Sequence, residues 1–203
     1  MKRSLPSTPD LCRSLGGTRS RVLFFSPAPR PVDEEDRQAA VDRLNLQGPA
    51  YRHLFHGLAD AAAALDPSGM AAISVIDGSR HRFLATAGFE SDDIARAISL
   101  CAHTIVSPTR WLCVNDLTCD PRFEGNPLVI GSPHARAYAG SAIIDHDGYA
   151  LGAVCMLSTS KTFMGSRIML ATLTGIAKQA SRLLLRDTPR SHSGRKGSFL
   201  SVV

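Results

Sequence analysis

The chain has 203 residues and a mass of 21.7 kDa, with 44% hydrophobic and 20% charged residues, a balance typical of one folded domain with or without tails. It has no run of about 18 apolar residues and no N-terminal apolar core of about seven, so we expect a cytoplasmic protein with neither a membrane span nor a secretory signal. The net charge is +5, but the chain ends (residues 1–32 and 186–203) hold ten of the 23 basic residues and two of the 18 acidic residues. Residues 33–185 therefore hold 13 basic and 16 acidic residues, a slight negative charge. A nucleic-acid-binding face is not expected on such a domain.

The two ends of the chain differ in composition from its middle. Residues 1–32 carry five prolines and scattered arginines, and residues 188–203 contain a Ser-His-Ser-Gly-Arg-Lys-Gly-Ser run. Neither stretch has a sustained apolar period, which is typical of disordered polypeptide. We therefore predict a disordered basic arm over residues 1–32, one domain over residues 33–187 and a disordered basic tail over residues 188–203.

Two helices are predicted at the start of the domain. The acidic run 33–36 places negative charge where a helix N-terminus favours it, and the first helix ends at Gly48-Pro49. Residues 51–65 repeat apolar side chains at three- and four-residue spacing, which predicts an amphipathic helix with one face against a core.

A β-hairpin and a third helix are predicted next. The apolar run 70–76 and residues 81–87 flank Asp77-Gly78, a strong signal for a tight turn between two strands. The run 91–93, Ser-Asp-Asp, is typical of a helix start with a capping residue and two acids. We expect that helix to continue through Cys101 on its apolar face.

The second half of the domain is predicted to contain more sheet. Residues 111–114 are expected to form a short strand, and residues 115–134 a long polar loop rich in Asp, Pro and Gly. Two longer strands follow over 135–144 and 149–157, and a final helix runs over about 165–186. Two hairpins with flanking helices indicate an antiparallel sheet, and a loop of about twenty residues is usually functional.

Five sequence elements then carry a family resemblance by their order and spacing. They are residues 100–105, 112–116, 120–129, 137–140 and 147–155. Together they resemble a GAF domain, of the subgroup found at the front of bacterial sensor histidine kinases and diguanylate cyclases, over about residues 37–186. The resemblance implies a cytoplasmic sensory module with a five- or six-stranded antiparallel sheet and helices on both sides. It also implies a small-molecule pocket between the sheet and the long loop, and end helices that can pair with a second copy.

The chain departs from the family pattern at three places. Ser141-Ala142-Ile143 stands where the family usually has a proline and a leucine, and Ala137 replaces an aromatic residue. Residues 158–161 take the place of an aspartate and a Pro-Arg pair. No kinase, cyclase or phosphodiesterase segment follows Arg186, so we expect a stand-alone module that acts by binding, or one that has lost its sensing role.

Five residues of the long loop and the next strand are candidate ligand contacts. Arg122 could pair with an anionic group, although its segment is also explained as a turn in which Phe123 plugs the loop into the core. Asp116 could accept a hydrogen bond from a ligand or from backbone amides of its own loop. Arg136 and Tyr138 lie two residues apart on one strand, hence on one sheet face, which is either the pocket face or the solvent face.

The cysteines define an enzyme alternative. Five cysteines without a CxxC pair indicate neither a disulfide framework nor a zinc site, and reduced thiols are expected. Free methionine sulfoxide reductases share the family fold and use one cysteine to attack sulfur and another to resolve the intermediate, roles that Cys101 and Cys119 would take here. However, the sequence around Cys119 resembles the sensory subgroup, and Cys101 falls on an apolar helix face. No histidine pair has metal-ligand spacing, so neither a metal nor a cofactor is expected.

We therefore predict an α+β, GAF-like fold and a stand-alone regulatory module rather than an enzyme. Its expected partners are a small-molecule ligand and a signalling protein or second copy bound through the terminal helices, with no nucleic acid and no membrane. Leu183, Leu184 and Leu185 support such pairing, because three consecutive leucines cannot all face the sheet. A further possibility is an interaction scaffold whose pocket is filled by Phe123 or Trp111.

Overall fold

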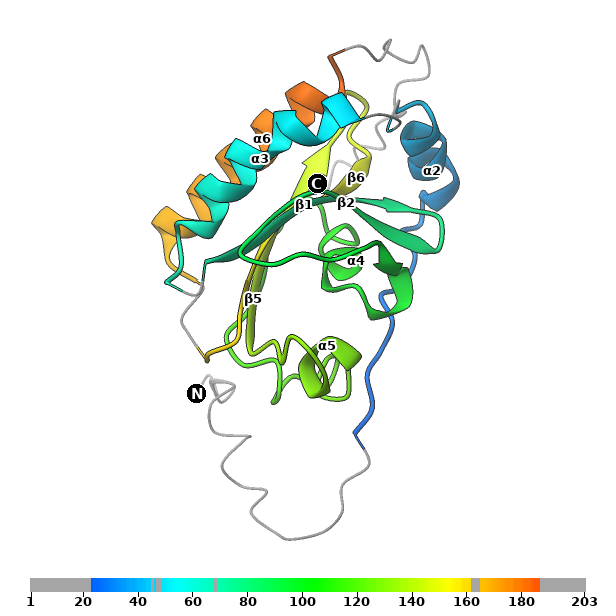
Figure 1. The fold of residues 1–203 in the computed structure, drawn as a ribbon. Helices are drawn as coiled ribbons and strands as arrows, with labels where there is room; N and C mark the ends of the chain where they lie inside the picture. Colours follow the sequence, from blue (N-terminus) through cyan, green and yellow to red (C-terminus); the bar gives the residue numbers. More distant parts are fainter. Residues whose placement is uncertain (1–22, 45, 47–48, 68, 162–164, 187–203) are drawn as a thin grey trace, which may run out of the picture.

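The computed structural model describes residues 23–44, 46, 49–67, 69–161 and 165–186. Its centre is a six-stranded antiparallel sheet in the order β3-β2-β1-β6-β5-β4, with helices on both faces (Figure 1). This confirms the predicted α+β fold. The strands are β1 (Met70–Asp77), β2 (Arg80–Ala87), β3 (Ile94–Ala95), β4 (Leu112–Val114), β5 (Ala137–Ile144) and β6 (Ala150–Ser158).

The two predicted hairpins supply four of these strands. β1 and β2 meet at the Asp77-Gly78 turn, where Gly78 adopts a φ of 57° that favours glycine. β5 and β6 meet at a turn in which Asp145 accepts hydrogen bonds from two backbone amides and Gly148 adopts a φ of 89°. The hairpins join through β1 and β6, which places Ala72 opposite Cys155.

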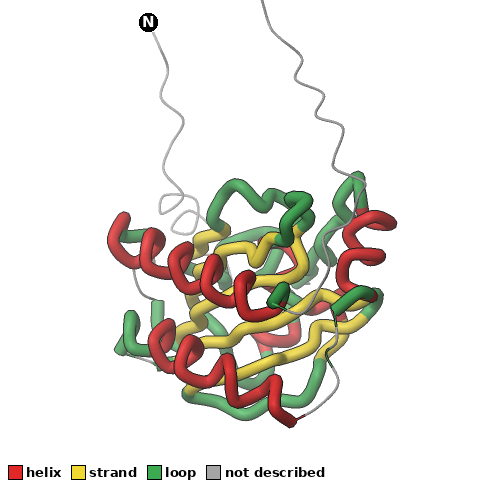
Figure 2. The backbone as a smooth tube through the Cα atoms, turned by 90° about the horizontal axis from the view of Figure 1, so that it is seen from above, coloured by secondary structure: helices red, strands yellow, loops and turns green. Residues whose placement is uncertain are grey.

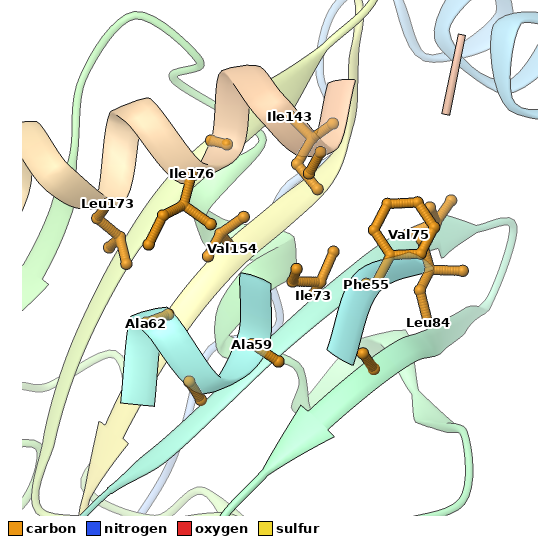
Figure 3. Packing of buried hydrophobic residues seen from close by; sticks show 14 of the residues in the cluster. Phe55, Ala59, Ala62, Ile73, Val75, Leu84, Ile143, Val154, Leu173 and Ile176 are labelled. Atoms are coloured by element: carbon orange, nitrogen blue, oxygen red, sulfur yellow. The ribbon is translucent and has the colours of Figure 1, made fainter. Parts of the chain in front are cut away.

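One face of the sheet is covered by two long helices, α3 (Pro49–Ala63) and α6 (Arg167–Leu184), seen side by side in Figure 2. Phe55 of α3 and Leu173 of α6 are fully buried against the strands, where Ile73 and Val154 meet them (Figure 3). Small residues such as Ala59 let α3 approach the sheet closely. The apolar spacing read from the sequence thus becomes the larger of two cores.

The opposite face is covered by short elements and loops. These are the 3₁₀-helix η1 (Arg96–Ile98), α4 (Leu100–Thr104) and α5 (Pro127–Ile130), together with the connections between α4 and β5. Ser99 caps α4 by accepting a hydrogen bond from the Ala102 amide at 3.0 Å, and Asn126 caps α5 in the same way. A second apolar cluster, which includes the fully buried Phe123, fills this side.

A buried ion network fixes α2 (Glu34–Asp42) to the end of the sheet. Arg37 is 1% exposed and donates hydrogen bonds to the carbonyl of Ile76 and to the Glu34 carboxylate, each at 2.8 Å. Arg96 binds the same carboxylate from η1. Burial by itself raises the pKa of Glu34, but the hydrogen bonds and charges of the two arginines outweigh it and lower that pKa to about 2.

The predicted helix start at residues 91–93 is wrong. Asp93 instead accepts a hydrogen bond from the Phe83 amide at 3.2 Å and pairs with Arg80 and Arg82 across the sheet edge. The chain therefore continues as β3 and η1, and α4 begins only after Ser99. The predicted loop over 115–134 also differs, because it contains the short helix α5.

The three consecutive leucines near the end of α6 do not form the surplus apolar surface that we expected. Leu184 and Leu185 are buried and Leu183 is partly buried. The helix ends at Leu184, so Leu185 leaves the helical path and turns to the same core. Within the described residues, no helix is long and apolar enough to cross a membrane.

Part of the predicted N-terminal arm lies against the domain. Residues 23–32 have no regular secondary structure, yet the Ser26 amide donates to the Arg122 carbonyl and the Gly125 amide to the Phe24 carbonyl. A Cβ at Gly125 would lie 2.6 Å from the Phe24 backbone, so glycine permits this close approach. The packed unit thus begins before Asp33, while residues 1–22 of the predicted arm, the whole predicted tail (188–203) and residue 187 of the predicted domain lie outside the described residues.

Candidate ligand-binding site

A cavity of about 360 Å³ lies between the sheet and the short elements on the face opposite α3 and α6. β1, β2, β5 and β6 form its floor, and α4, α5 and the segment around residues 89–94 form its walls. The lining is mainly apolar, as small-molecule sites usually are. Its apolar members include Ala72, Phe83, Phe89, Leu100, Leu128 and Leu157.

His81 lies on β2 and borders the cavity. The residue is 3% exposed, and its Nδ1 lies 3.0 Å from the Ser99 hydroxyl that also caps α4. Its Nε2 is buried and has no hydrogen-bond partner among the described residues. An unpaired buried ring nitrogen is costly, and it offers one hydrogen-bonding atom to a group that enters the site.

Tyr138 lies across the floor of the cavity because Gly140 leaves room for it. The tyrosine hydroxyl is 2.7 Å from Thr104 Oγ1, and it donates to the Cys101 sulfur at 3.4 Å. A Cβ at residue 140 would fall 2.7 Å from Thr104 Oγ1 and would also overlap the tyrosine hydroxyl. The tyrosine-alanine-glycine element of the sequence is therefore a packing unit of this site. Burial and the two nearby thiols raise the pKa of Tyr138.

Two cysteine side chains meet beside this tyrosine. Cys101 from α4 and Cys155 from β6 lie close enough for each to shift the pKa of the other, and both border the cavity. The contact with Cys155, opposed by burial and assisted by His81 and Tyr138, lowers the pKa of Cys101. The contact with Cys101 and burial raise the pKa of Cys155.

The charge of the lining restricts what can bind. Among the described residues that border the cavity there is no lysine or arginine, and Glu90 is its one carboxylate. An anionic group would therefore meet no counter-charge there, and removing it from water would cost several kcal/mol. The site is suited to a neutral molecule.

Of the five predicted ligand contacts, the structure brings only Tyr138 to this cavity. Phe123 is fully buried in the loop core, where its ring packs at 4.7 Å from that of His103. Arg136 precedes β5 and donates to the carbonyls of Val129 and Ala135, so its guanidinium holds the loop that carries α5.

The other two predicted residues hold the loop itself. Asp116 accepts hydrogen bonds from the amide and hydroxyl of Thr118 and pairs with Lys161 at 2.7 Å. Burial opposes these contacts, but they lower the pKa of Asp116. Arg122 is bidentate with Asp120 and stacks over Phe123 at 4.8 Å. The turn interpretation accounts for these contacts.

The structure pairs the cysteines differently from the enzyme alternative. Cys101 is a free, buried thiol, whereas Cys119 is disulfide-bonded, so this bond does not join the two. The sulfur that meets Cys101 is that of Cys155. In the part of the chain that the structure describes, no three His, Cys, Asp or Glu side chains are grouped to hold a metal ion.

Sequence reasoning missed His81 and Cys155. Both lie on strands, where periodicity assigns a residue to a face but does not say which residue of another element meets it. Cys155 lies opposite Gly140 on one side and Ala72 on the other. The two flanking small residues are the signal that could have found this position.

Comparison with known proteins identifies a relative by sequence. A cyclic di-GMP phosphodiesterase of Pseudomonas aeruginosa is 36% identical over 129 residues, which are 64% of this chain and 22% of that protein. The chain thus spans about a fifth of that relative's length.

Solved structures share the fold at low sequence identity. The type II free methionine-R-sulfoxide reductase of Thermoplasma acidophilum has a TM-score of 0.55 at 15% identity, covering 75% of this chain and 98% of that one. The GAF domain of an Acinetobacter phosphoenolpyruvate-protein phosphotransferase has a TM-score of 0.56 at 12% identity, covering 76% and 94%. Residues 20–184 match the family model described as GAF domain, and the chain therefore belongs to the GAF domain family.

Proposed function

We propose that this protein is a regulatory GAF module that binds a neutral, largely apolar small molecule in the cavity between β2, β6 and α4. The observation that carries the proposal is the cavity itself, which has an apolar lining and one polar atom, Nε2 of His81, that has no partner among the described residues. Such a site holds a ligand by burial of apolar surface and orients it by one or two hydrogen bonds.

The chemistry of the walls defines the ligand class. Nucleotides and free amino acids carry charges that the lining does not match, since Arg122 and Arg136 are engaged outside it. A flat or compact neutral molecule would pack between Phe83 and Leu128 and direct one polar atom to His81. This supports a ligand other than a cyclic nucleotide.

The module would act in cytoplasmic signalling of the kind in which histidine kinases and diguanylate cyclases carry such domains at their front. The Pseudomonas relative, named a cyclic di-GMP phosphodiesterase, supports a place in signal transduction. A ligand that favours one position of α4 would shift the population of the whole domain toward that arrangement. A signalling protein or a second copy would detect the shift through the terminal helices.

Pairing through α6 can be tested at one exposed residue. Ile168, in the first turn of the helix, is 81% exposed, so a substitution there leaves the core intact. Light scattering is expected to give about twice the 21.7 kDa of one chain. An Ile168→Glu variant should return the mass to that of one chain, and a wild type that is monomeric at high concentration would refute the pairing.

Ligand binding is tested by filling the cavity from α5. Leu128→Trp places a large ring inside it, whereas Ile130→Trp adds the same ring to a side chain on the same helix that is 56% exposed and outside the lining. Native mass spectrometry of protein purified from its own host should show an added small mass in the wild type and in Ile130→Trp only. An equal added mass in all three proteins, or none in the wild type, would contradict the proposal.

The alternative, reduction of free methionine sulfoxide, has one observation in its favour: a thiol pair borders the cavity. However, that pair is not the predicted Cys101 and Cys119, and the described lining holds no cation for the carboxylate of an amino acid. With dithiothreitol as reductant, we expect no turnover of free methionine sulfoxide. Turnover that Cys119→Ser abolishes would establish the enzyme instead.

A further inference from the structure

Two buried thiols meet at the edge of the cavity although they are far apart in the sequence. Cys101 arrives on α4 and is 2% exposed, while Cys155 arrives on β6 and is 7% exposed. Both side chains belong to the lining of the same cavity and to the same apolar cluster, and each thiol is close enough to shift the pKa of the other. Apolar packing accounts for each thiol separately, but it does not account for their contact at an open cavity.

The neighbours of Cys101 are those that activate a thiol. The Tyr138 hydroxyl donates to its sulfur at 3.4 Å, and Thr104 holds that hydroxyl in place at 2.7 Å. His81 also borders the cavity, and it is close enough to Cys101 to lower the pKa of that thiol. Cys155, His81 and Tyr138 therefore each favour a thiolate at Cys101.

Cys113 supplies a contrast within the same chain. It lies on β4 and packs partly buried against the other core, and burial raises its pKa. Its one described hydrogen bond has the thiol as donor, to the Asn115 side chain at 3.8 Å. Cys113 therefore has none of the contacts that favour a thiolate at Cys101.

We propose that Cys101 and Cys155 form a reactive dithiol site whose substrate is a neutral hydroperoxide that enters the cavity. The mainly apolar lining, in which the described residues include no lysine or arginine, admits hydrogen peroxide and small organic hydroperoxides alike, with the peroxide oxygens at the thiols and any apolar tail along Phe83 and Leu128. The proposal concerns the thiols and does not depend on which ligand occupies the cavity otherwise.

The reaction proceeds in two steps. The Cys101 thiolate attacks one peroxide oxygen, so that an S–O bond forms and the O–O bond breaks; the departing oxygen takes up a proton and leaves as an alcohol, or as water from hydrogen peroxide. The Cys155 sulfur then attacks the sulfenic acid, so that an S–S bond forms and hydroxide leaves with the Cys155 proton as water. Two thiols are oxidised to one disulfide, and one hydroperoxide is reduced.

Digestion with trypsin places Cys101 and Cys155 in different peptides. Cleavage after lysine and arginine leaves Cys101 in peptide 97–110, Cys155 in peptide 137–161, and Cys113 with Cys119 in peptide 111–122. The full-length protein is first reduced with dithiothreitol, and the dithiothreitol is then removed. The protein is treated with one equivalent of hydrogen peroxide or cumene hydroperoxide. Its remaining free thiols are blocked before digestion with trypsin. Mass spectrometry should show peptides 97–110 and 137–161 joined and lighter by two hydrogens, with either peroxide.

Variants assign the two roles. In Cys155→Ser the sulfenic acid on Cys101 should persist and be trapped by dimedone, whereas Cys101→Ser should leave Cys155 unmodified. Cys113→Ser, the matched control, should react as the wild type does. Cys101 should be oxidised about tenfold or more faster than Cys113, because the attacking species is the thiolate.

The outcomes are distinct from those of the ligand test. Absence of the joined peptides with both peroxides, or oxidation of Cys113 before Cys101, would overturn the dithiol proposal even if an added small mass is found in the native protein. The wild-type peptide map needs no substitution, so it decides the proposal even where a variant fails to fold.

Discussion

The two faces of the sheet are covered by different kinds of structure. On one face, long helices α3 and α6 lay continuous apolar stripes on the strands, and residues such as Phe55 and Leu173 are fully buried. On the other face, short helices and loops surround a cavity of about 360 Å³ bordered by His81 and two thiols. The first face is filled by its own side chains, while the second keeps space and leaves a polar atom without a partner among the described residues.

The helical face contributes mainly to stability, whereas the cavity face carries the candidate functional groups. Close packing makes every methylene on the helical face count toward the free energy of folding. The cavity face loses part of that packing and retains groups that folding does not need, as functional sites commonly do. Substitutions should therefore have unequal costs on the two faces, and four tests follow from this difference.

The largest expected effect comes from one substitution made on each face. Phe55→Ala removes a fully buried ring on the helical face and should lower the free energy of unfolding by about 3–5 kcal/mol. Phe83→Ala removes a partly buried ring that borders the cavity and should cost about 1–2 kcal/mol. Urea denaturation measures both. Equal costs would mean that the two faces do not differ in packing.

A smaller effect comes from adding one methyl group to each face. Gly140→Ala directs a Cβ at the Tyr138 hydroxyl and at Thr104 and should destabilise the protein by about 1–3 kcal/mol. Gly175→Ala on α6 meets no atom within 4 Å and should stabilise it by about 0.5–1 kcal/mol through helix propensity. Thermal unfolding should show opposite signs; a common sign would refute the tight packing of the tyrosine.

The ion network at α2, where the two faces end, predicts that the stability of the protein falls in acid. The pKa of Glu34 is about 2 in the folded protein and 4.5 ordinarily. Its contribution to the free energy of unfolding is therefore fully present above about pH 4.5 and is lost as the pH falls toward 2. After a discount for solvent screening, the loss should be about 1–2 kcal/mol. Glu34→Gln should be less stable at pH 7 and show a flatter decline between pH 5 and 2 in urea denaturation, and an unchanged decline would rule out this carboxylate as its cause.

The smallest effect is expected at the loop surface. Arg122→Ala breaks a pair with Asp120 in which the arginine side chain is 44% exposed, and such pairs contribute about 0–1 kcal/mol. Since Arg122 lies outside the cavity lining, the added mass seen by native mass spectrometry should persist in this variant. Its loss would return Arg122 to the ligand site that the sequence predicted.

The fold was predictable because its signals are local. Asp77-Gly78 and Gly148 mark the two hairpins, and the three- and four-residue apolar spacing marks α3 and α6. The prediction failed around Asp93, whose carboxylate accepts from the Phe83 amide instead of capping a helix. A capping residue and a residue that binds a neighbouring strand look alike in sequence, since both use a short acidic side chain.

The site was predictable only in part. Tyr138 follows from strand parity, but Arg136 has the same parity and precedes the strand, so its side chain binds loop carbonyls. The meeting of Cys101 with Cys155 depends on how α4 packs over β6, a tertiary contact between residues with no fixed spacing. Local patterns place each cysteine on its element and leave the partner open.

The short stretch of chain before α2 has a mechanical consequence. Its Ser26 carbonyl contacts His103 Nε2 at 3.0 Å, and its backbone is bonded to the turn at residues 122–125. His103 lies on α4, the same short helix as Cys101. A tilt of α4 would therefore act on residues 23–32, which contact His103 and lie on the outside of the molecule. We therefore expect a displacement of α4 in the interior to move residues 23–32 at the surface.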